Sequence, residues 1–288
     1  MSGLSLESYG WAGAAEGAGA GAASISQAGP AKAEGRYDIR RGAEGYAPII
    51  GAFGALAVPA IIVLFTVPRS RGPAPLVALA AGLLVVAMIA SITSSIGMAA
   101  VGAEQDATAN LVPAVMFLAV AVAVSLVAVL AAFEVLAAIY LPHSTKLFAV
   151  IAGAAGLAGS FFAALGIADS WHTGPADPAE KAIWQTTQWI RTQRQADEQT
   201  LRVTSVSAVP AMAGIALRIA GVHATPTAGL ATWLVIATFA LAMAAVGRGA
   251  FRTRHPVHGP QKGLRRREAY GTTLAISLYA LVMMIFLP

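Results

Sequence analysis

Two ionisable residues lie inside long apolar segments and are the side chains best placed to do chemistry. Glu134 interrupts the run VLAAFEVLAAIYLP (129–142), and Arg218 interrupts AGIALRIAGVHA (213–224). An uncompensated charge near the middle of a bilayer is unfavourable by roughly 3 kcal/mol on insertion scales, so each residue needs a partner. The sequence predicts an ion pair between them, as part of a polar pathway or as a helix–helix contact. The alternative is that Arg218 extends to the headgroups while Glu134 is protonated or lies near the interface.

A cluster of hydroxyl residues and a cluster of glycines are the next candidates for a functional or packing role inside the membrane. A hydroxyl inside a membrane helix either hydrogen-bonds its own or a neighbouring helix or lines a path for a solute. The segment SITSSIG supplies such a candidate polar path with Ser91, Thr93, Ser94 and Ser95. Small residues spaced three or four apart let helix backbones approach closely. The segment GAAGLAG therefore predicts a helix-packing face at Gly153, Gly156 and Gly159.

The elements that carry these residues are membrane-spanning helices. The chain has 288 residues, of which 57% are hydrophobic and 11% are charged, against roughly 25% charged in soluble domains. Segments of about 20 apolar residues are long enough to cross roughly 30 Å of hydrocarbon, and these do not alternate as barrel strands do. The fold class is an all-α membrane protein, a bundle of about seven transmembrane helices. The expected spans are residues 46–67, 75–102, 111–141, 146–167, 203–222, 227–246 and 269–287.

Two further segments lie outside these spans. Residues 1–45 are rich in Ala, Gly and Ser, which predicts a disordered cytoplasmic tail. In the loop after the fourth span, Asp177 and Pro178 begin a helix over about 178–200 with Trp184 and Trp189 at its flanks. We expect this amphipathic helix to lie at the membrane surface, with a docking surface for a cytoplasmic partner as the alternative.

Lys and Arg are distributed unevenly between the two sides of this seven-span scheme. With the N-terminus inside, fifteen lie in cytoplasmic segments and three in outer segments, while Arg218 lies within a span. The positive-inside rule then predicts a multi-pass cell-membrane protein with a cytoplasmic N-terminus and an extracytoplasmic C-terminus. Glu134 and Arg218 both precede an outer helix end, so they are expected at similar depth.

The basic segment 248–268 is the largest cluster of charge. Its main role is expected to be fixing the orientation of the last two spans. Binding of anionic lipid is an alternative and nucleic acid a less favoured one, with the contacts made by Arg265, Arg266 and Arg267.

The sequence contains no cysteine, no phosphate-binding loop and no GxSxG or HExxH motif. We therefore expect no enzyme activity, cofactor or metal centre, and no recognisable catalytic residues. Two function classes remain open. One is a permease or pore-like component for a small solute or ion. The other is a non-transporting membrane anchor or assembly subunit that recruits protein, anionic lipid or nucleic acid through its basic loops. The expected partners are the lipid bilayer and other copies or other subunits.

Overall fold

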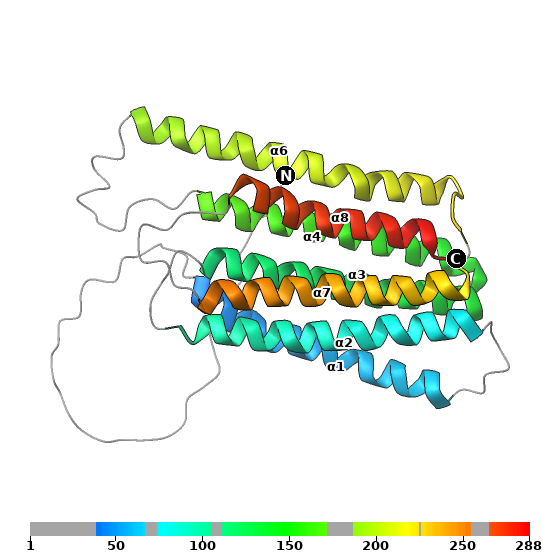
Figure 1. Ribbon diagram of the computed structural model, residues 1–288. Coiled ribbons are helices and arrows are strands. Elements are labelled where there is room, and N and C mark those ends of the chain that lie inside the picture. The colour runs from blue at the N-terminus through cyan, green and yellow to red at the C-terminus, as the bar shows by residue number, and fades with distance from the viewer. Residues whose placement is uncertain (1–38, 67–73, 105–110, 172–186, 225, 255–264) are drawn as a thin grey trace, which may run out of the picture. The chain divides into compact units, whose positions relative to one another are not determined.

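The computed structural model describes residues 39–66, 74–104, 111–171, 187–224, 226–254 and 265–288 (Figure 1). All regular structure within these ranges is helical, and seven helices are long and apolar enough to cross a membrane. This confirms the predicted all-α membrane bundle. The elements are α1 (Ile39–Thr66), α2 (Ala74–Gly102), α3 (Leu111–Tyr140), the short 3-10 turn η2 (Pro142–Ser144), α4 (Thr145–Trp171), α6 (Thr187–Ile219), α7 (Ala228–Arg254) and α8 (Arg266–Phe286).

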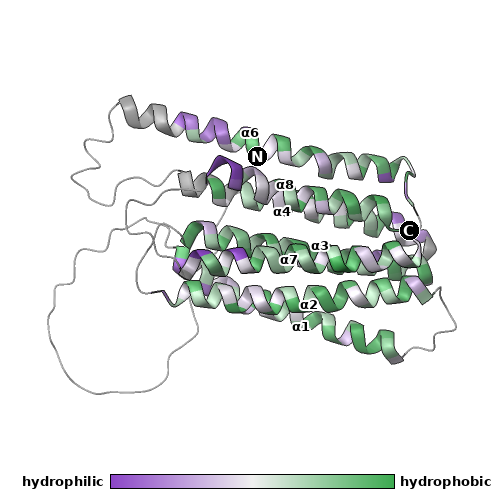
Figure 2. Ribbon diagram, in the orientation of Figure 1, coloured by the Kyte–Doolittle hydropathy of each residue, from purple (hydrophilic) through white to green (hydrophobic). Residues whose placement is uncertain are grey.

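The helices lie side by side with α3 at the centre of the bundle (Figure 1). Helix α3 packs against α2, α4, α7 and α8, whereas α1 packs mainly on α2, and α6 packs on α4 and α8. Successive long helices run in opposite directions, so α6 and α8 run parallel to each other. The apolar residues cover the middle of the bundle and the hydrophilic ones gather toward its ends (Figure 2), as expected for helices that cross hydrocarbon.

The glycines singled out in the sequence lie where α4 meets its neighbours. A Cβ atom added at Gly153 would lie 2.5 Å from the sulfur of Met284 on α8 and 2.7 Å from Ile215 on α6. One added at Gly159 would lie 3.3 Å from Ile276. A Cβ at Gly156 would meet the methyl group of Ala280. Because these glycines have no side chains, α4 and α8 can approach closely over the two turns from Gly153 to Gly159.

The first helix begins earlier than expected. Residues 39–45 were assigned to the disordered tail, but they form the first turns of α1, and residues 1–38 lie outside the described part. Ala43 is buried and packs in a cluster that contains Met98 and Leu111, from α2 and α3. Tertiary packing thus extends the helix beyond the apolar run that signals the span.

The helix that contains the fifth span begins at Thr187, well before Val203, where the span was expected to begin. Where the sequence suggested a separate surface helix over about 178–200, residues 187–200 are instead the first turns of α6, and residues 178–186 lie outside the described part. Glycine and proline are absent between Thr187 and Val209, so nothing in this stretch ends a helix. Helix α6 also continues through Pro210.

Candidate functional site

Glu134 and Arg218, the two charges within apolar segments, lie in contact. Glu134 is carried by the penultimate turns of α3, and Arg218 by the last turn of α6. Arg218 Nη2 donates to Glu134 Oε1 at 2.5 Å. Each side chain is only 1% exposed, so the pair is enclosed by the bundle. The structure therefore brings the two residues together at a common depth in the bundle.

The end of α8 completes the surroundings of Arg218. Arg218 Nη1 donates to the backbone carbonyl of Leu287 at 2.9 Å, and Nη2 also contacts the carbonyl oxygen of Pro288. The last carbonyls of a helix have no partner within the helix, and a cationic side chain is a favourable donor to them. The guanidinium group thus links α6 to α3 through a carboxylate and to α8 through backbone oxygens.

Part of the hydrogen-bonding capacity of the pair is unmet. Glu134 Oε2 and Arg218 Nε are buried and have no hydrogen-bond partner among the residues that the structure describes. A buried polar atom without a partner is destabilising by about 1–3 kcal/mol, and more when the group is charged. The site therefore retains one acceptor and one donor that a small polar species can use.

A polar seam between α6 and α8 leads toward this pair. The hydroxyls of Ser207 and Thr273 lie 2.5 Å apart, and both residues are buried. Four residues further along each helix, the backbone N–H of Ala211 donates to the hydroxyl of Ser277 at 3.0 Å. Residues 207, 211 and 218 share one face of α6 because they are separated by four and seven positions. Buried polar groups thus occur at intervals along this interface up to Arg218.

This seam between α6 and α8 was not predicted from the sequence. Hydroxyl residues in membrane helices often bond to their own backbone, as Thr273 also does with the carbonyl of Ala269 at 3.0 Å. The only available signal was the matching four-residue spacing of Ser207 with Ala211 and of Thr273 with Ser277. Using it required knowing that α6 and α8 are neighbours.

The hydroxyls of the predicted polar path in α2 are mostly engaged in helix contacts. Ser91 and Ser125 form a 2.6 Å hydrogen bond between α2 and α3, and Ser95 donates to the Ala47 carbonyl of α1 at 2.7 Å. Thr93 bonds to carbonyls of its own helix. Their hydrogen-bond partners belong to α1, α2 and α3, which favours helix packing over lining a path. Ser94 Oγ is buried and has no hydrogen-bond partner within the described residues.

His223 lies in the turn just beyond α6, at the same end as the buried pair. Desolvation lowers the pKa of His223, and the positive charges of Arg218 and Lys146 lower it further. Its imidazole is therefore more readily neutral than an ordinary histidine. Within the described residues, no three His, Asp or Glu side chains are grouped so that they could hold a metal ion.

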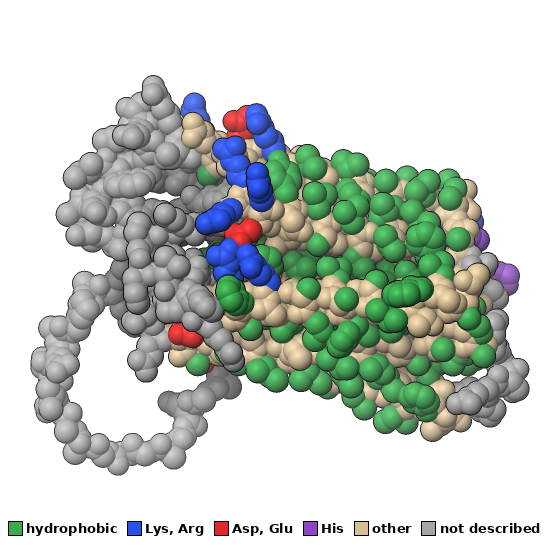
Figure 3. Space-filling view, viewed as in Figure 1, with side chains coloured by type: hydrophobic (Ala, Val, Ile, Leu, Met, Phe, Trp, Pro, Cys, Tyr) green, Lys and Arg blue, Asp and Glu red, His purple; other side chains and the backbone are tan. Residues whose placement is uncertain are grey.

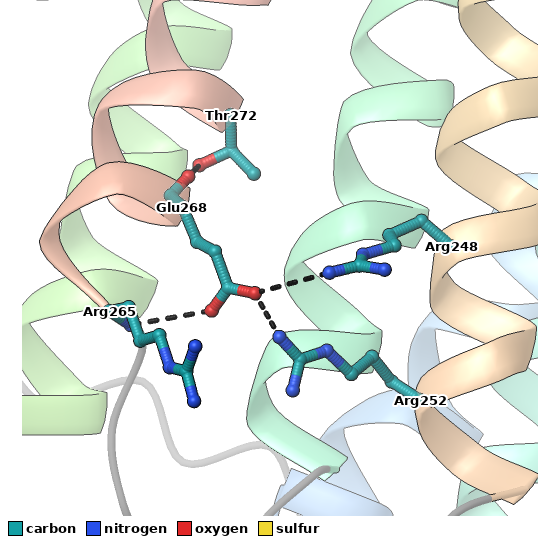
Figure 4. A network of polar contacts seen from close by, with 5 residues as sticks. All are labelled: Arg248, Arg252, Arg265, Glu268 and Thr272. Atoms are coloured by element: carbon teal, nitrogen blue, oxygen red, sulfur yellow. Dashed lines mark hydrogen bonds and ion pairs between the residues drawn. The ribbon is translucent and has the colours of Figure 1, made fainter.

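A second group of charges lies where α7 ends and α8 begins, at the opposite end of the bundle, and Figure 4 shows its contacts. Glu268, in the first turn of α8, contacts Arg252 and lies 3.7 Å from Arg248, both on α7. Its second oxygen accepts from the backbone N–H of Arg265 at 3.4 Å, which caps the start of α8. Glu268 thus joins the end of α7 to the beginning of α8.

The candidate partner-contact residues belong to this same end. Arg265, Arg266 and Arg267 are exposed, and the described arginines outside the buried pair gather here (Figure 3). Trp184 lies outside the described residues, and Trp189 is on α6 but its side chain is not described. The structure therefore groups the arginine candidates and leaves the tryptophans untested.

Known proteins give no guide to the role of this site. No family model, curated protein or solved structure matches the chain. The geometry of its own residues must therefore carry any proposal about function.

Proposed function

We propose that the protein is a multi-pass membrane permease or pore-like component for a small solute or ion, with Glu134 and Arg218 as its central polar element. The supporting observation is that this enclosed pair keeps one carboxylate oxygen and one guanidinium nitrogen without a described partner. Ionisable residues inside membrane segments commonly mark substrate or ion pathways. A purely structural pair is less well explained, because apolar residues of similar volume often stabilise as well or better.

The polar groups between α6 and α8 suggest the route that a small polar species would take to the buried pair. Ser207, Thr273 and Ser277 place polar atoms along the interface that ends at Arg218. We propose that a small polar species exchanges with these groups when α6 and α8 separate slightly. Pro210 lies within the seam, and a proline inside a helix weakens the local backbone hydrogen bonding that otherwise resists bending.

The proposed orientation places the arginine-rich end in the cytoplasm. The arginine-rich end comprises the start of α6, the end of α7 and the start of α8, with Arg194, Arg202, Arg248, Arg252 and Arg265–Arg267, whereas Lys146 lies in the first turn of α4 at the other end. The positive-inside rule favours this arrangement. The buried pair would then lie in the outer half of the bundle, with a cytoplasmic N-terminus and an extracytoplasmic C-terminus.

Flux into proteoliposomes tests the proposal. Purified protein is reconstituted, and entry of protons, Na⁺, K⁺, Cl⁻ and glycerol is measured against empty liposomes. At least one species should enter faster with the protein present. Glu134→Gln should slow that flux by about tenfold or more, corresponding to roughly 1.4 kcal/mol of lost stabilisation along the path. Glu104→Gln is the matched control, because Glu104 is exposed at the opposite end of the bundle.

The outcomes separate the proposal from a structural role. Both variants must elute as folded protein on size-exclusion chromatography. Equal fluxes for Glu134→Gln and Glu104→Gln would show that the pair is not part of a path. Wild-type flux equal to that of empty liposomes for all five species would contradict the permease proposal.

A second candidate, a non-transporting anchor or assembly subunit, is favoured by the arginine-rich end. Phe251 is exposed there, close in sequence to Arg248 and Arg252. Charged clusters with an exposed aromatic residue suit recruitment of an acidic partner. If Arg265→Gln, Arg266→Gln and Arg267→Gln together displace co-purifying proteins while the pair variants do not, this candidate is supported instead.

A further inference from the structure

A small cleft opens between α6 and the first turns of α8 at the arginine-rich end. It is lined by Gln199, Arg202, Val203, Arg266 and Tyr270, and its volume is about 90 Å³. We propose that this cleft binds the phosphate-bearing headgroup of an anionic phospholipid. None of its lining residues belongs to the buried pair, so the inference stands whether or not the protein transports a solute.

The two arginines enter the cleft from separate helices. Arg266 Nε donates to Gln199 Oε1 at 3.2 Å, which braces the guanidinium of α8 against α6. Arg202 Nη2 donates to Glu198 at 2.5 Å on the outer surface of α6. A guanidinium carries five N–H donors in a planar fork that fits phosphate oxygens. Each contact engages one nitrogen, so both arginines keep further donors for a phosphate.

The nearest acid of α8 is directed elsewhere. Glu268 is two residues beyond Arg266, and residues two apart do not share a helix face. Its carboxylate is held by Arg248 and Arg252 of α7 and by the backbone of Arg265 (Figure 4). The cleft thus keeps a positive charge that this carboxylate does not neutralise.

The cleft is large enough for a phosphate group. One water needs roughly 10–15 Å³ of comparable volume, and the cleft has several times that. Tyr270 is half-buried at its wall, and an aromatic ring with a polar hydroxyl is favoured at the level of membrane headgroups. Size, charge and depth are therefore compatible with one headgroup.

The surface beyond the cleft favours a lipid over free phosphate. One and two turns further along α6, the face that carries Arg202 continues with Val206 and Val209, which are 49% and 63% exposed. On α8, the face of Tyr270 continues with Leu274 and with Leu278, which is 47% exposed. Exposed apolar side chains covering the bundle beside the arginines (Figure 3) give acyl chains a surface to pack on.

Native mass spectrometry of the full-length protein in neutral detergent tests the assignment. The probes are phosphatidylglycerol, phosphatidylcholine and inorganic phosphate. Wild-type protein should retain phosphatidylglycerol in preference to the other two. The variant R202Q/R266Q should weaken phosphatidylglycerol binding by about thirty-fold or more, because each substitution removes direct charge-assisted hydrogen bonds to the phosphate.

The matched control is R194Q/R267Q. It removes the same charge from the same two helices, from exposed residues that do not line the cleft. This control should bind phosphatidylglycerol within about three-fold of wild type at physiological salt, because charges that do not contact the bound headgroup are largely screened. Equal weakening in the two double variants would overturn the assignment.

Three other results would also overturn it. Wild-type protein could fail to retain phosphatidylglycerol, or it could bind inorganic phosphate as tightly as the lipid, which would identify a free-phosphate site. In a competition arm, a short RNA could displace the lipid from wild type at lower concentration than phosphatidylglycerol itself, which would identify a nucleic-acid surface. Unchanged thermal unfolding of R202Q/R266Q checks that the variant remains folded.

Discussion

Two glutamate–arginine contacts lie at opposite ends of the bundle and differ mainly in their access to water. In the first, Glu134 and Arg218 are each 1% exposed. In the second, Glu268 is 15% exposed, while Arg252 and Arg248 are 21% and 50% exposed. The chemical groups are the same, so any difference in their energetics comes from the surroundings.

Burial changes what such a contact can do. Removing two charges from water is unfavourable, and a buried pair recovers this only when its geometry and additional hydrogen bonds are good. An exposed pair pays little desolvation and gains little, typically about 0–1 kcal/mol. The buried pair is therefore a strict constraint on helix arrangement, whereas the exposed network mainly orients two helix ends.

Helix α8 takes part in both contacts. Its first turn is joined to α7 through Glu268, and the carbonyl of Leu287, just beyond its last turn, accepts from Arg218 of α6. Between these ends it packs closely on α4 along the glycine face. The comparison shows one helix held at its exposed end by charges in partial contact with solvent and at its buried end by a pair whose side chains are only 1% exposed.

Arg218→Ala should give the largest loss of stability. It leaves the Glu134 carboxylate buried without its cation, and breaking a buried pair in this way destabilises by about 3–5 kcal/mol. Unfolding in mixed detergent and SDS micelles measures the change. Arg252→Ala is the matched control, since Glu268 keeps partial solvent access and Arg248 nearby, and it should lose about 1 kcal/mol or less.

The double variant E134L/R218M sharpens this prediction. Replacing both partners with apolar residues removes the unpaired charge, so it should be much less destabilising than Arg218→Ala alone. A loss equal to the sum of the two single changes would mean that Glu134 and Arg218 are not energetically coupled. If the double variant is stable but inactive in the flux assay, the pair is needed for function more than for folding.

Gly156→Ala should produce an intermediate effect. Its new methyl group would meet Ala280 of α8, and overpacking of a closely packed interface is destabilising by about 1–3 kcal/mol. Gly247→Ala is the control, because a Cβ at Gly247 meets nothing within 4 Å. The same unfolding assay should show the control at or slightly above wild-type stability. Equal losses in the two variants would mean that contact between the new methyl group and α8 is not what destabilises Gly156→Ala.

The sequence was sufficient to predict the seven spans, because apolar length alone determines which segments cross a bilayer. The sequence also predicted that Glu134 and Arg218 lie at a similar depth. The order of the spans gives the direction of each helix, and the position of each residue in its span gives its distance from the helix end. The close α4 contacts followed from the spacing of small residues. These inferences need only local sequence and the up-and-down order of the helices.

Other features depend on which helices are neighbours, and hydropathy contains no such information. The bond between Ser207 and Thr273 and the approach of the Leu287 carbonyl to Arg218 both require α6 beside α8. The role of Glu268 was hidden for a similar reason, because Arg252 precedes it by sixteen residues across a stretch assigned to a loop. The early starts of α1 and α6 were missed because their first turns contain charged residues and lie before the apolar runs from which the spans were predicted.

Glu268→Gln should have the smallest effect on stability and the strongest dependence on salt. The amide keeps a hydrogen-bond acceptor for Arg252 but removes the negative charge, so the loss should be about 0–1 kcal/mol at low ionic strength. At 1 M salt the Debye length falls to about 3 Å, and the difference from wild type should nearly vanish. Thermal unfolding at 0.01 M and 1 M salt measures this, with Arg218→Ala expected to keep most of its deficit at both concentrations because its site is enclosed. A salt-independent loss for Glu268→Gln would show that the two ends are held by the same kind of contact, and the distinction between them would fail.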